Sequence, residues 1–394
     1  MSLYTRPVGR IFPLLYFGGI YMEVLLQNFS YITLPMVIMW VIGGVLIYLA
    51  IAKEMEPTLL LPMGFGAILV NLPVAEAGTG VQLVLDTLFS IGIDGAELFP
   101  LMLFIGIGAM IDFTPLLTNP KLMIFGAAAQ FGIFFTLALA SLLGYDIRDA
   151  ASIAIIGAAD GPTSIFVANM LQSKYLGAIM VAAYSYMALV PLIQPPIIKL
   201  CTTKAERKIK MQYKGKPVSK LTKILFPIVV TVIVGLVAPD AVALIGFLMF
   251  GNLIRECGVM NSISETAQNA LANLITIFLG ITIASQMKAA DFLQVDTLII
   301  IGLGLVAFVF DTIGGVMVAK LMNLFSKEKI NPMIGAAGIS AFPMSARVVH
   351  KMGLEEDNQN FLLMHSIGVN VSGQIASVVA GGLILALVKG VIGG

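Results

Sequence analysis

Runs of about 20 apolar residues recur along the whole chain, and this pattern limits the fold more than any other feature. A run of about that length forms a helix that crosses a hydrocarbon layer roughly 30 Å thick. Charged residues make up only 11% of the 394 residues, against roughly 25% in a soluble protein, and the mean hydropathy is +0.97. We therefore expect an all-α, polytopic protein that crosses a lipid bilayer many times and has no separate soluble domain.

Charge and motif content argue against several classes of function. The formal net charge of +1 is no indication of a nucleic-acid partner, and none is expected. The isolated Cys201 and Cys257, with His350 and His365, provide no ligand spacing for a transition metal. A GxxxxGK[ST] phosphate-binding loop is absent from the sequence, so we do not expect this chain to hydrolyse ATP.

The apolar runs predict about eleven transmembrane segments. There are twelve runs, but several are short or interrupted by Gly and Pro, so we do not expect every run to cross the membrane. Residues 1–30 are expected to form an N-terminal interfacial segment, because Arg10 and Glu23 stand there among Phe and Tyr. The runs are 32–52, 58–73, 97–111, 121–144, 150–172, 175–198, 222–237, 240–257, 269–285, 295–322, 330–349 and 359–388.

One long hydrophilic connection, residues 199–223, separates two similar stretches of chain. It holds nine of the 23 Lys and Arg residues and a single acid, Glu206. Positively charged loops stay in the cytoplasm, so we expect a basic cytoplasmic loop between a first membrane half, 31–198, and a second, 224–394.

Short strings recur in the same order in the two halves. IGAA at 156–159 returns at 334–337, which is 178 residues later. FIGIG at 104–108 and IDF at 111–113 have counterparts in FLGIT at 278–282 and ADF at 290–292. A nearly constant offset on both sides of one basic loop predicts an internal duplication.

Each IGAA string stands at a break rich in Gly and Pro. Corresponding interrupted segments in two halves are the best sequence indication of a transporter's site near the middle of the membrane. Asp160 lies inside the first break, in IIGAADGPTSIF. A charge at membrane depth costs about 2.5 kcal/mol or more and is usually functional. We interpret Asp160 as a site for a hard cation or a proton, the alternative being a helix cap without a role in transport.

Further polar groups interrupt the apolar segments. In the second break, Asn331 and Ser340 offer neutral oxygens, and Arg347 is either an interfacial anchor or a clamp for a carboxylate. Tyr186 lies near the middle of its segment, which favours a phenol facing the interior. The last segment carries the polar side chains of Asn370, Ser372 and Gln374, with Gly373 among them.

Other charged residues are less distinctive. Asp311 lies deep in an apolar run and is either a second ion ligand or a packing partner for a Ser or Tyr. Glu97, Asp112 and Lys121 fall at segment ends, so we expect them to be solvated.

Three motifs together resemble one family. GAADGPTSIF, NPMIGAAGISAFPMSAR and NVSGQIAS are similar to the β subunits of the biotin-dependent decarboxylase sodium pumps that act on oxaloacetate, methylmalonyl-CoA or glutaconyl-CoA. The resemblance runs from about residue 30 to the C-terminus. It implies a membrane subunit that decarboxylates carboxybiotin, consumes a proton and exports sodium, with inverted repeats in an elevator-like arrangement.

The resemblance also implies the site and the partners. Sodium would be the only metal, and biotin would be attached to a partner. The partners would be a carboxyltransferase α subunit, a biotin carrier protein and a small membrane γ/δ subunit in a bacterial inner membrane; the pattern leaves a homo-oligomer open. Catalytic roles fall on Asp160, Tyr186 and Arg347, sodium binding on Asp160, Asn331, Gly335, Ser340 and Asn370, carboxybiotin binding on Arg347 and Ser340, and secondary roles on Asp311, Ser372 and Thr163.

Two alternatives remain from the residues. A sodium-coupled carboxylate transporter or a sodium/proton antiporter would share the repeats, the breaks and the buried acid. A membrane scaffold without catalytic activity would give no reason for Asp160. The parent acid is left open, because that specificity would belong to another polypeptide.

Overall fold

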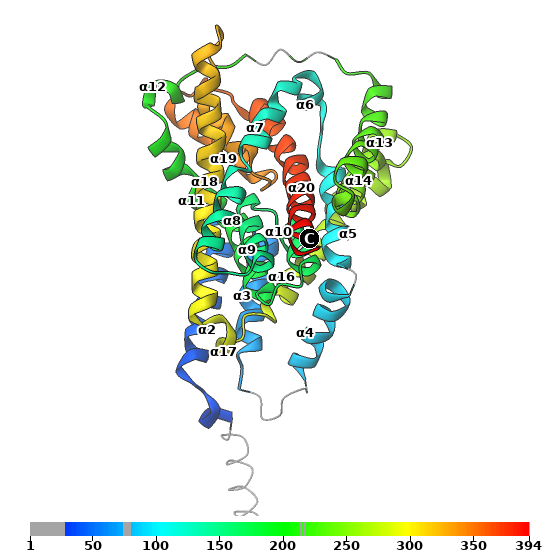
Figure 1. Ribbon diagram of the computed structural model, residues 1–394. Coiled ribbons are helices and arrows are strands. Elements are labelled where there is room, and N and C mark those ends of the chain that lie inside the picture. The colour runs from blue at the N-terminus through cyan, green and yellow to red at the C-terminus, as the bar shows by residue number, and fades with distance from the viewer. Residues whose placement is uncertain (1–27, 74–79, 96, 213–214, 216, 394) are drawn as a thin grey trace, which may run out of the picture.

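The computed structural model describes residues 28–73, 80–95, 97–212, 215 and 217–393, and every regular element in these ranges is a helix (Figure 1). This confirms the all-α class. Up to the basic segment the α-helices are α2 (Leu34–Ala52), α3 (Pro57–Val70), α4 (Val81–Phe89), α5 (Leu98–Met110), α6 (Thr114–Thr118), α7 (Met123–Ala128), α8 (Phe131–Leu142), α9 (Ile147–Ala154), α10 (Gly161–Met170) and α11 (Leu176–Cys201). After it come α12 (Lys204–Arg207), α13 (Lys220–Val237), α14 (Val242–Cys257), α15 (Asn261–Thr266), α16 (Ala272–Ala284), α17 (Ala289–Phe292), α18 (Val295–Phe325), α19 (Met344–Glu356) and α20 (Leu363–Gly393).

Seven spans in the described residues are long and apolar enough to cross a membrane. They become eight if Val81–Asp94 and Leu98–Met110, which are bent by 63°, count as one span. Length and composition therefore do not confirm the expected count of about eleven. One reason is that α3, α5 and α14 have only 14, 13 and 16 residues. The expected N-terminal interfacial segment lies almost wholly outside the described residues.

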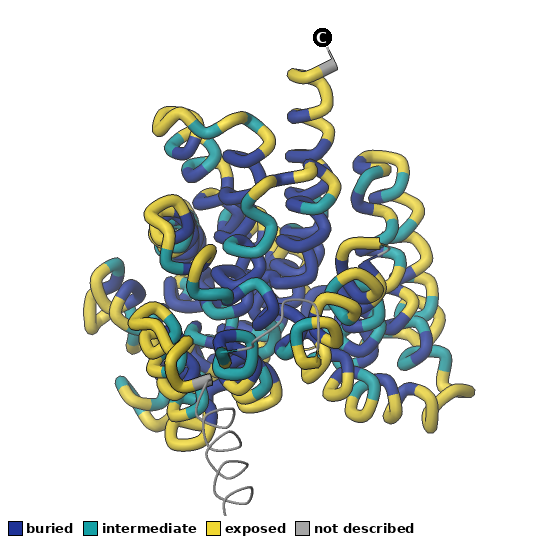
Figure 2. The backbone as a smooth tube through the Cα atoms, turned by 90° about the horizontal axis from the view of Figure 1, so that it is seen from below, coloured by how far each residue is buried: buried dark blue, intermediate teal, exposed yellow. Residues whose placement is uncertain are grey.

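The outer helices expose apolar side chains. On α13, Leu221, Val232 and Leu236 are 65%, 56% and 81% exposed. Such a surface is costly in water but suits contact with lipid tails. Buried residues concentrate in the middle of the molecule and exposed ones at its periphery (Figure 2).

Residues 150–172 do not form the one membrane-crossing segment expected from the apolar run, because the chain reverses at the Gly/Pro break. This stretch consists of α9, the 3₁₀ turn η4 (Ile155–Ala158) and α10. Ser173 Oγ donates to Asp149 Oδ1 over 2.7 Å, so the residues after α10 lie beside the start of α9. Ala159, in the left-handed region with φ +50°, lies at the reversal. We call this unit, residues 147–173, hairpin 1.

The segment expected at 330–349 reverses as well. The 3₁₀ helix η7 (Pro332–Gly338) leads inward and α19 leads back. The Nδ2 groups of Asn331 and Asn360 both donate to the Arg207 carbonyl over 2.9 Å, so the two ends of the unit lie together. We call residues 331–360 hairpin 2.

Helix α18 shows that the two hairpins open toward opposite ends of the molecule. Its 31 residues correspond to about 46 Å. Near its start, Tyr175 Oη donates to Asp296 at the base of hairpin 1, and near its end Lys320 pairs with Glu206 beside the base of hairpin 2. The tips meet, because Ser340 N donates to Ala158 O over 3.0 Å. This is the arrangement expected for inverted repeats; the duplication and its boundaries stay predictions.

Both IGAA strings lie against α18 through their glycines. A Cβ at Gly335 would lie 2.1 Å from the Gly315 carbonyl oxygen, and one at Gly157 would lie 2.8 Å from Ala307 Cβ. Real Cβ atoms do not approach so closely, so these two positions require glycine for packing. The repeated string is explained by a shared docking surface on one long helix.

Candidate functional site at the meeting of the hairpin tips

Asp160 lies at the tip of hairpin 1 and is only 3% exposed. It caps α10, accepting from Thr163 N at 3.4 Å and Thr163 Oγ1 at 2.8 Å. Its Oδ2 also accepts from Ser377 Oγ of α20 over 3.0 Å. Asp160 is therefore a helix cap, and in addition it joins hairpin 1 to α20.

Ser340 forms the facing tip of hairpin 2. Besides its backbone bond to Ala158, its Oγ donates to Gly373 O over 2.9 Å, and its carbonyl accepts from Gln374 Nε2. Hairpin 1, hairpin 2 and α20 are thus joined at one place. We call it the tip junction and define it by residues 158–163, 338–341 and 370–377.

Acceptor oxygens without hydrogen bonds gather at the tip junction. Asn370 uses its Nδ2 on Ala337 O and Ile339 O, at 3.1 and 2.7 Å, which leaves its Oδ1 buried and unbonded. Gln374 Oε1 is in the same state. Buried acceptors normally have a partner, and carboxylate and amide oxygens are the ligands of hard cations. The residues present therefore fit a cation beside Asp160.

Two tyrosines of α11 face different neighbours. Tyr186 is buried, as expected, but its hydroxyl donates to the Ile301 carbonyl of α18 and not to the tip junction. The ring of Tyr184 lies against Gly161, where a Cβ would be 2.3 Å from it, and its hydroxyl has no hydrogen bond. Sequence reasoning missed Tyr184, because two residues of the same type in one apolar helix give no sign of which one faces the acid.

Asn331 and Gly335 lie farther along hairpin 2. Asn331 Nδ2 donates to the carbonyls of Arg207 and Ile209, and its Oδ1 accepts from Met333 N. About 14 Å of 3₁₀ helix separate Asn331 from the tip. The structure thus places Thr163 against Asp160, and Ser340 and Asn370 at the same tip junction. Asn331 instead holds the base of hairpin 2, and Gly335 packs on α18.

The other candidates have local partners. Asp311 Oδ1 accepts from the backbone amides of Gly132 and Ile133 at the start of α8, so its partner is a helix end and neither a Ser nor a Tyr. Ser372 Oγ donates to the carbonyls of Leu122 and Val369, at 3.0 and 2.6 Å.

Arg347 lies on α19, three turns before the base of hairpin 2, and is exposed. Burial raises the pKa of the Glu56 carboxyl at the start of α3, and the nearby Arg347 guanidinium opposes this increase. Arg347 is therefore available to an anionic ligand from the exposed side of the hairpin.

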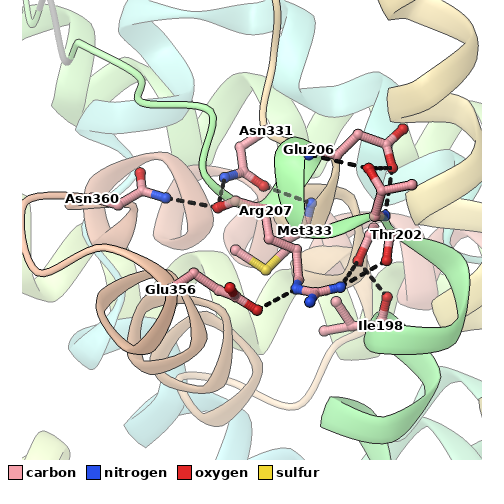
Figure 3. Close-up of polar contacts among 9 residues, drawn as sticks. Ile198, Thr202, Glu206, Arg207, Asn331, Met333, Glu356 and Asn360 are labelled. Atoms are coloured by element: carbon pink, nitrogen blue, oxygen red, sulfur yellow. Dashed lines mark hydrogen bonds and ion pairs between the residues drawn. The ribbon is translucent and has the colours of Figure 1, made fainter.

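A folded part of the basic segment covers the base of hairpin 2 (Figure 3). Arg207 Nε donates to Glu356 Oε1 over 2.6 Å, and its Nη1 donates to Thr202 O over 2.7 Å. Lys210 pairs with Asp357 over 3.0 Å. We call residues 202–211 the strap; these contacts attach it to the base of hairpin 2.

A cavity of about 650 Å³ opens beside the strap. Its cationic lining residues are Lys121, Lys210 and Lys329, with Glu328 as the acid of the lining. Ile334 of η7 also lines it, so the cavity reaches the second hairpin from the end of the molecule that carries the strap.

The prediction that Glu97 is solvated is wrong. The same prediction holds for Asp112, which is partly exposed, and for Lys121, which is exposed. Glu97 is 5% exposed and accepts from Asn169 Nδ2 over 2.9 Å. The end of an apolar run does not mark the membrane surface here, because the chain bends at this point and Glu97 stays buried.

Comparison with known proteins finds relatives that are all named as decarboxylase β subunits or β chains. The family model described as "Na+-transporting oxaloacetate decarboxylase beta subunit" matches residues 35–388. The chain is 50% identical to the methylmalonyl-CoA decarboxylase subunit beta of Propionigenium modestum, covering 89% of this chain and 94% of the relative. It is 51% identical to the glutaconyl-CoA decarboxylase subunit beta of Acidaminococcus fermentans, covering 90% and 93%. It is 48% identical to the probable oxaloacetate decarboxylase beta chain of Vibrio cholerae, covering 90% and 95%.

Proposed function

The chain belongs to the family of β subunits of sodium-transporting decarboxylases, and from this premise we propose that it decarboxylates carboxybiotin and exports sodium. The observation that carries the site assignment is the tip junction. One carboxylate, Asp160, lies there among buried oxygens that lack hydrogen bonds, between two hairpins that open to opposite ends. A single ion bound there would touch both hairpins.

The reaction balances without an oxidant or a nucleotide. The bond between the biotin nitrogen and the carboxyl carbon breaks, CO₂ leaves, and the nitrogen takes one proton. Sodium beside Asp160 balances the carboxylate charge, and its release requires another positive charge to replace it. A proton on Asp160 can do so, which couples proton consumption to sodium export. Tyr186 stays a proposed catalytic group that must first leave its bond to Ile301.

Two basic features support delivery of the anionic substrate. The cavity with Lys121, Lys210 and Lys329 lies at the end that carries the strap, and a positive lining attracts a carboxylate. Arg347 can bind the carboxylate through two parallel hydrogen bonds, and Ser340 lies at the tip beyond it.

Partners and location follow from the family. We propose a carboxyltransferase α subunit, a biotin carrier protein and a small γ/δ membrane subunit, in a bacterial inner membrane with the strap on the cytoplasmic side. The three relatives named above carry three different parent acids in their names at 48–51% identity, which supports selection of the acid on another subunit. Family membership favours this function over an independent carboxylate carrier or antiporter.

The orientation is tested with one introduced cysteine. Cys201 and Cys257 are replaced by Ser, and exposed Gly215 is replaced by Cys. An impermeant thiol reagent should label this site in inverted vesicles and not in intact cells. Labelling in intact cells would place the basic segment outside.

The function is tested by purifying the tagged chain with its neighbours and assaying the complex. We expect a biotinylated protein to co-purify and carboxybiotin to decompose only with sodium present. Carboxylate transport by the chain alone, without a biotinylated partner, would overturn the proposal.

A further inference from the structure

Glu97 is a buried carboxylate that no role described above uses. It lies between the π-helical turn Ser90–Asp94 and α5, with its backbone in the left-handed region at φ +52°. A non-glycine residue held there is uncommon and often marks a functional bend. Its Oε2 is buried and forms no hydrogen bond.

Helix α10 connects this carboxylate to the tip junction. Asp160 caps the start of α10, and Asn169 near its end donates to Glu97 Oε1 and, over 3.5 Å, to Asp94 O. Asn169 lies nine positions after Asp160, which corresponds to about 14 Å along a helix. One short helix therefore has a buried carboxylate at each end.

The position of Glu97 along the molecule gives its direction. Hairpin 1 opens toward the end opposite the strap, and α10 runs from the tip toward that end. Asn169 thus lies on the side away from the proposed entry of carboxybiotin. Among the described residues, no basic side chain forms an ion pair with Glu97.

We propose that Glu97 is the outer sodium site, a hard-cation station between Asp160 and the far side of the membrane. This inference rests on the proposed function. The oxygen ligands near the site are the Glu97 carboxylate, whose Oε2 forms no hydrogen bond, and the Asp94 carbonyl. Oxygen atoms of these two kinds suit sodium. Sodium leaving Asp160 occupies Glu97 before release, and sodium from the far side fills Glu97 first and slows export.

The test uses the whole complex in proteoliposomes with the strap side outward. Sodium outside activates decarboxylation through Asp160, and sodium in the lumen inhibits it through Glu97. Glu97→Gln keeps the shape and removes the charge, so the luminal sodium concentration for half inhibition should rise about tenfold, as for one lost charged contact. The external concentration for half activation should stay unchanged. Glu97→Asp should fall between, and the exposed-acid control Glu265→Gln should match wild type.

Wild-type luminal inhibition in Glu97→Gln, or equal shifts of both constants, would overturn the outer site. If Glu97→Gln does not assemble, wild-type luminal inhibition in Glu97→Asp would overturn it. Failure of the proposed function looks different, since the wild-type complex would then show no sodium-dependent decarboxylation.

Discussion

Hairpin 1 and hairpin 2 share the IGAA string and the same docking helix, yet they differ in charge and in support. The tip of hairpin 1 carries the carboxylate of Asp160, while the tip of hairpin 2 offers the neutral Ser340. The base of hairpin 1 is held by Asp149 and Ser173, whereas the base of hairpin 2 is clamped by the strap through Arg207.

This difference separates binding from control. One formal charge at the junction is enough to select a cation, and a second carboxylate would leave a further uncompensated negative charge there after sodium leaves. The neutral hairpin is the one tied to the basic segment, where soluble partners would act. We infer that hairpin 1 holds the ion and that hairpin 2 relays events from the strap.

The largest effect is expected for Asp160→Asn. The change is nearly isosteric but removes the charge, so sodium-dependent decarboxylation should fall about 100-fold or more, as for a lost contact of about 3 kcal/mol. The matched control is Asp311→Asn, which should lower the thermal stability of the complex without changing its sodium requirement. A changed sodium requirement in the control would make Asp311 a second ligand.

Arg347→Lys should come next. It keeps the charge but loses the planar fork, so carboxybiotin turnover at saturating sodium should drop by about tenfold or more. Arg148→Lys, at an exposed arginine of hairpin 1, serves as the control. Lower sodium affinity with normal turnover would contradict a carboxylate-binding role for Arg347.

Asn370→Ala and Ser340→Ala should act on sodium affinity. Each removes a neutral oxygen from the tip junction, so the sodium concentration for half activity should rise about tenfold. Asn331→Ala should raise this concentration less, because the polar atoms of Asn331 form hydrogen bonds to the strap and η7. A larger effect from Asn331 would mean that the base of hairpin 2 contributes to the ion site.

The smallest effect is expected for Glu356→Gln at the strap. The hydrogen bond from Arg207 lowers the pKa of Glu356, so the pair stabilises the folded protein above the carboxyl's unfolded pKa. This stabilisation, about 1 kcal/mol for a mostly covered pair, is lost as the pH falls through the lowered pKa. The unfolding temperatures of the wild type and of Glu356→Gln should therefore differ at neutral pH and become equal in acid. A constant difference would mean that packing, not charge, holds the strap.

The sequence predicted the broken segments and most of the junction, because glycine, proline and buried polar residues are local signals. It did not predict the reversals, since an apolar run of about 20 residues reads the same whether it crosses or turns back. Ser377 could have been found, because it lies seven residues after Asn370 and three after Gln374, on one helix face. Glu97 could not, because its burial depends on a bend and on Asn169, 72 residues away.

The measurement that tests the central claim most directly is the sodium dependence of carboxybiotin decarboxylation by the wild-type complex at several pH values. Because sodium and a proton compete for the Asp160 carboxylate, the sodium concentration for half activity should rise as the pH falls, while the maximal rate at saturating sodium stays reachable. A sodium requirement that does not change with pH would contradict the assignment of Asp160 as the coupling group.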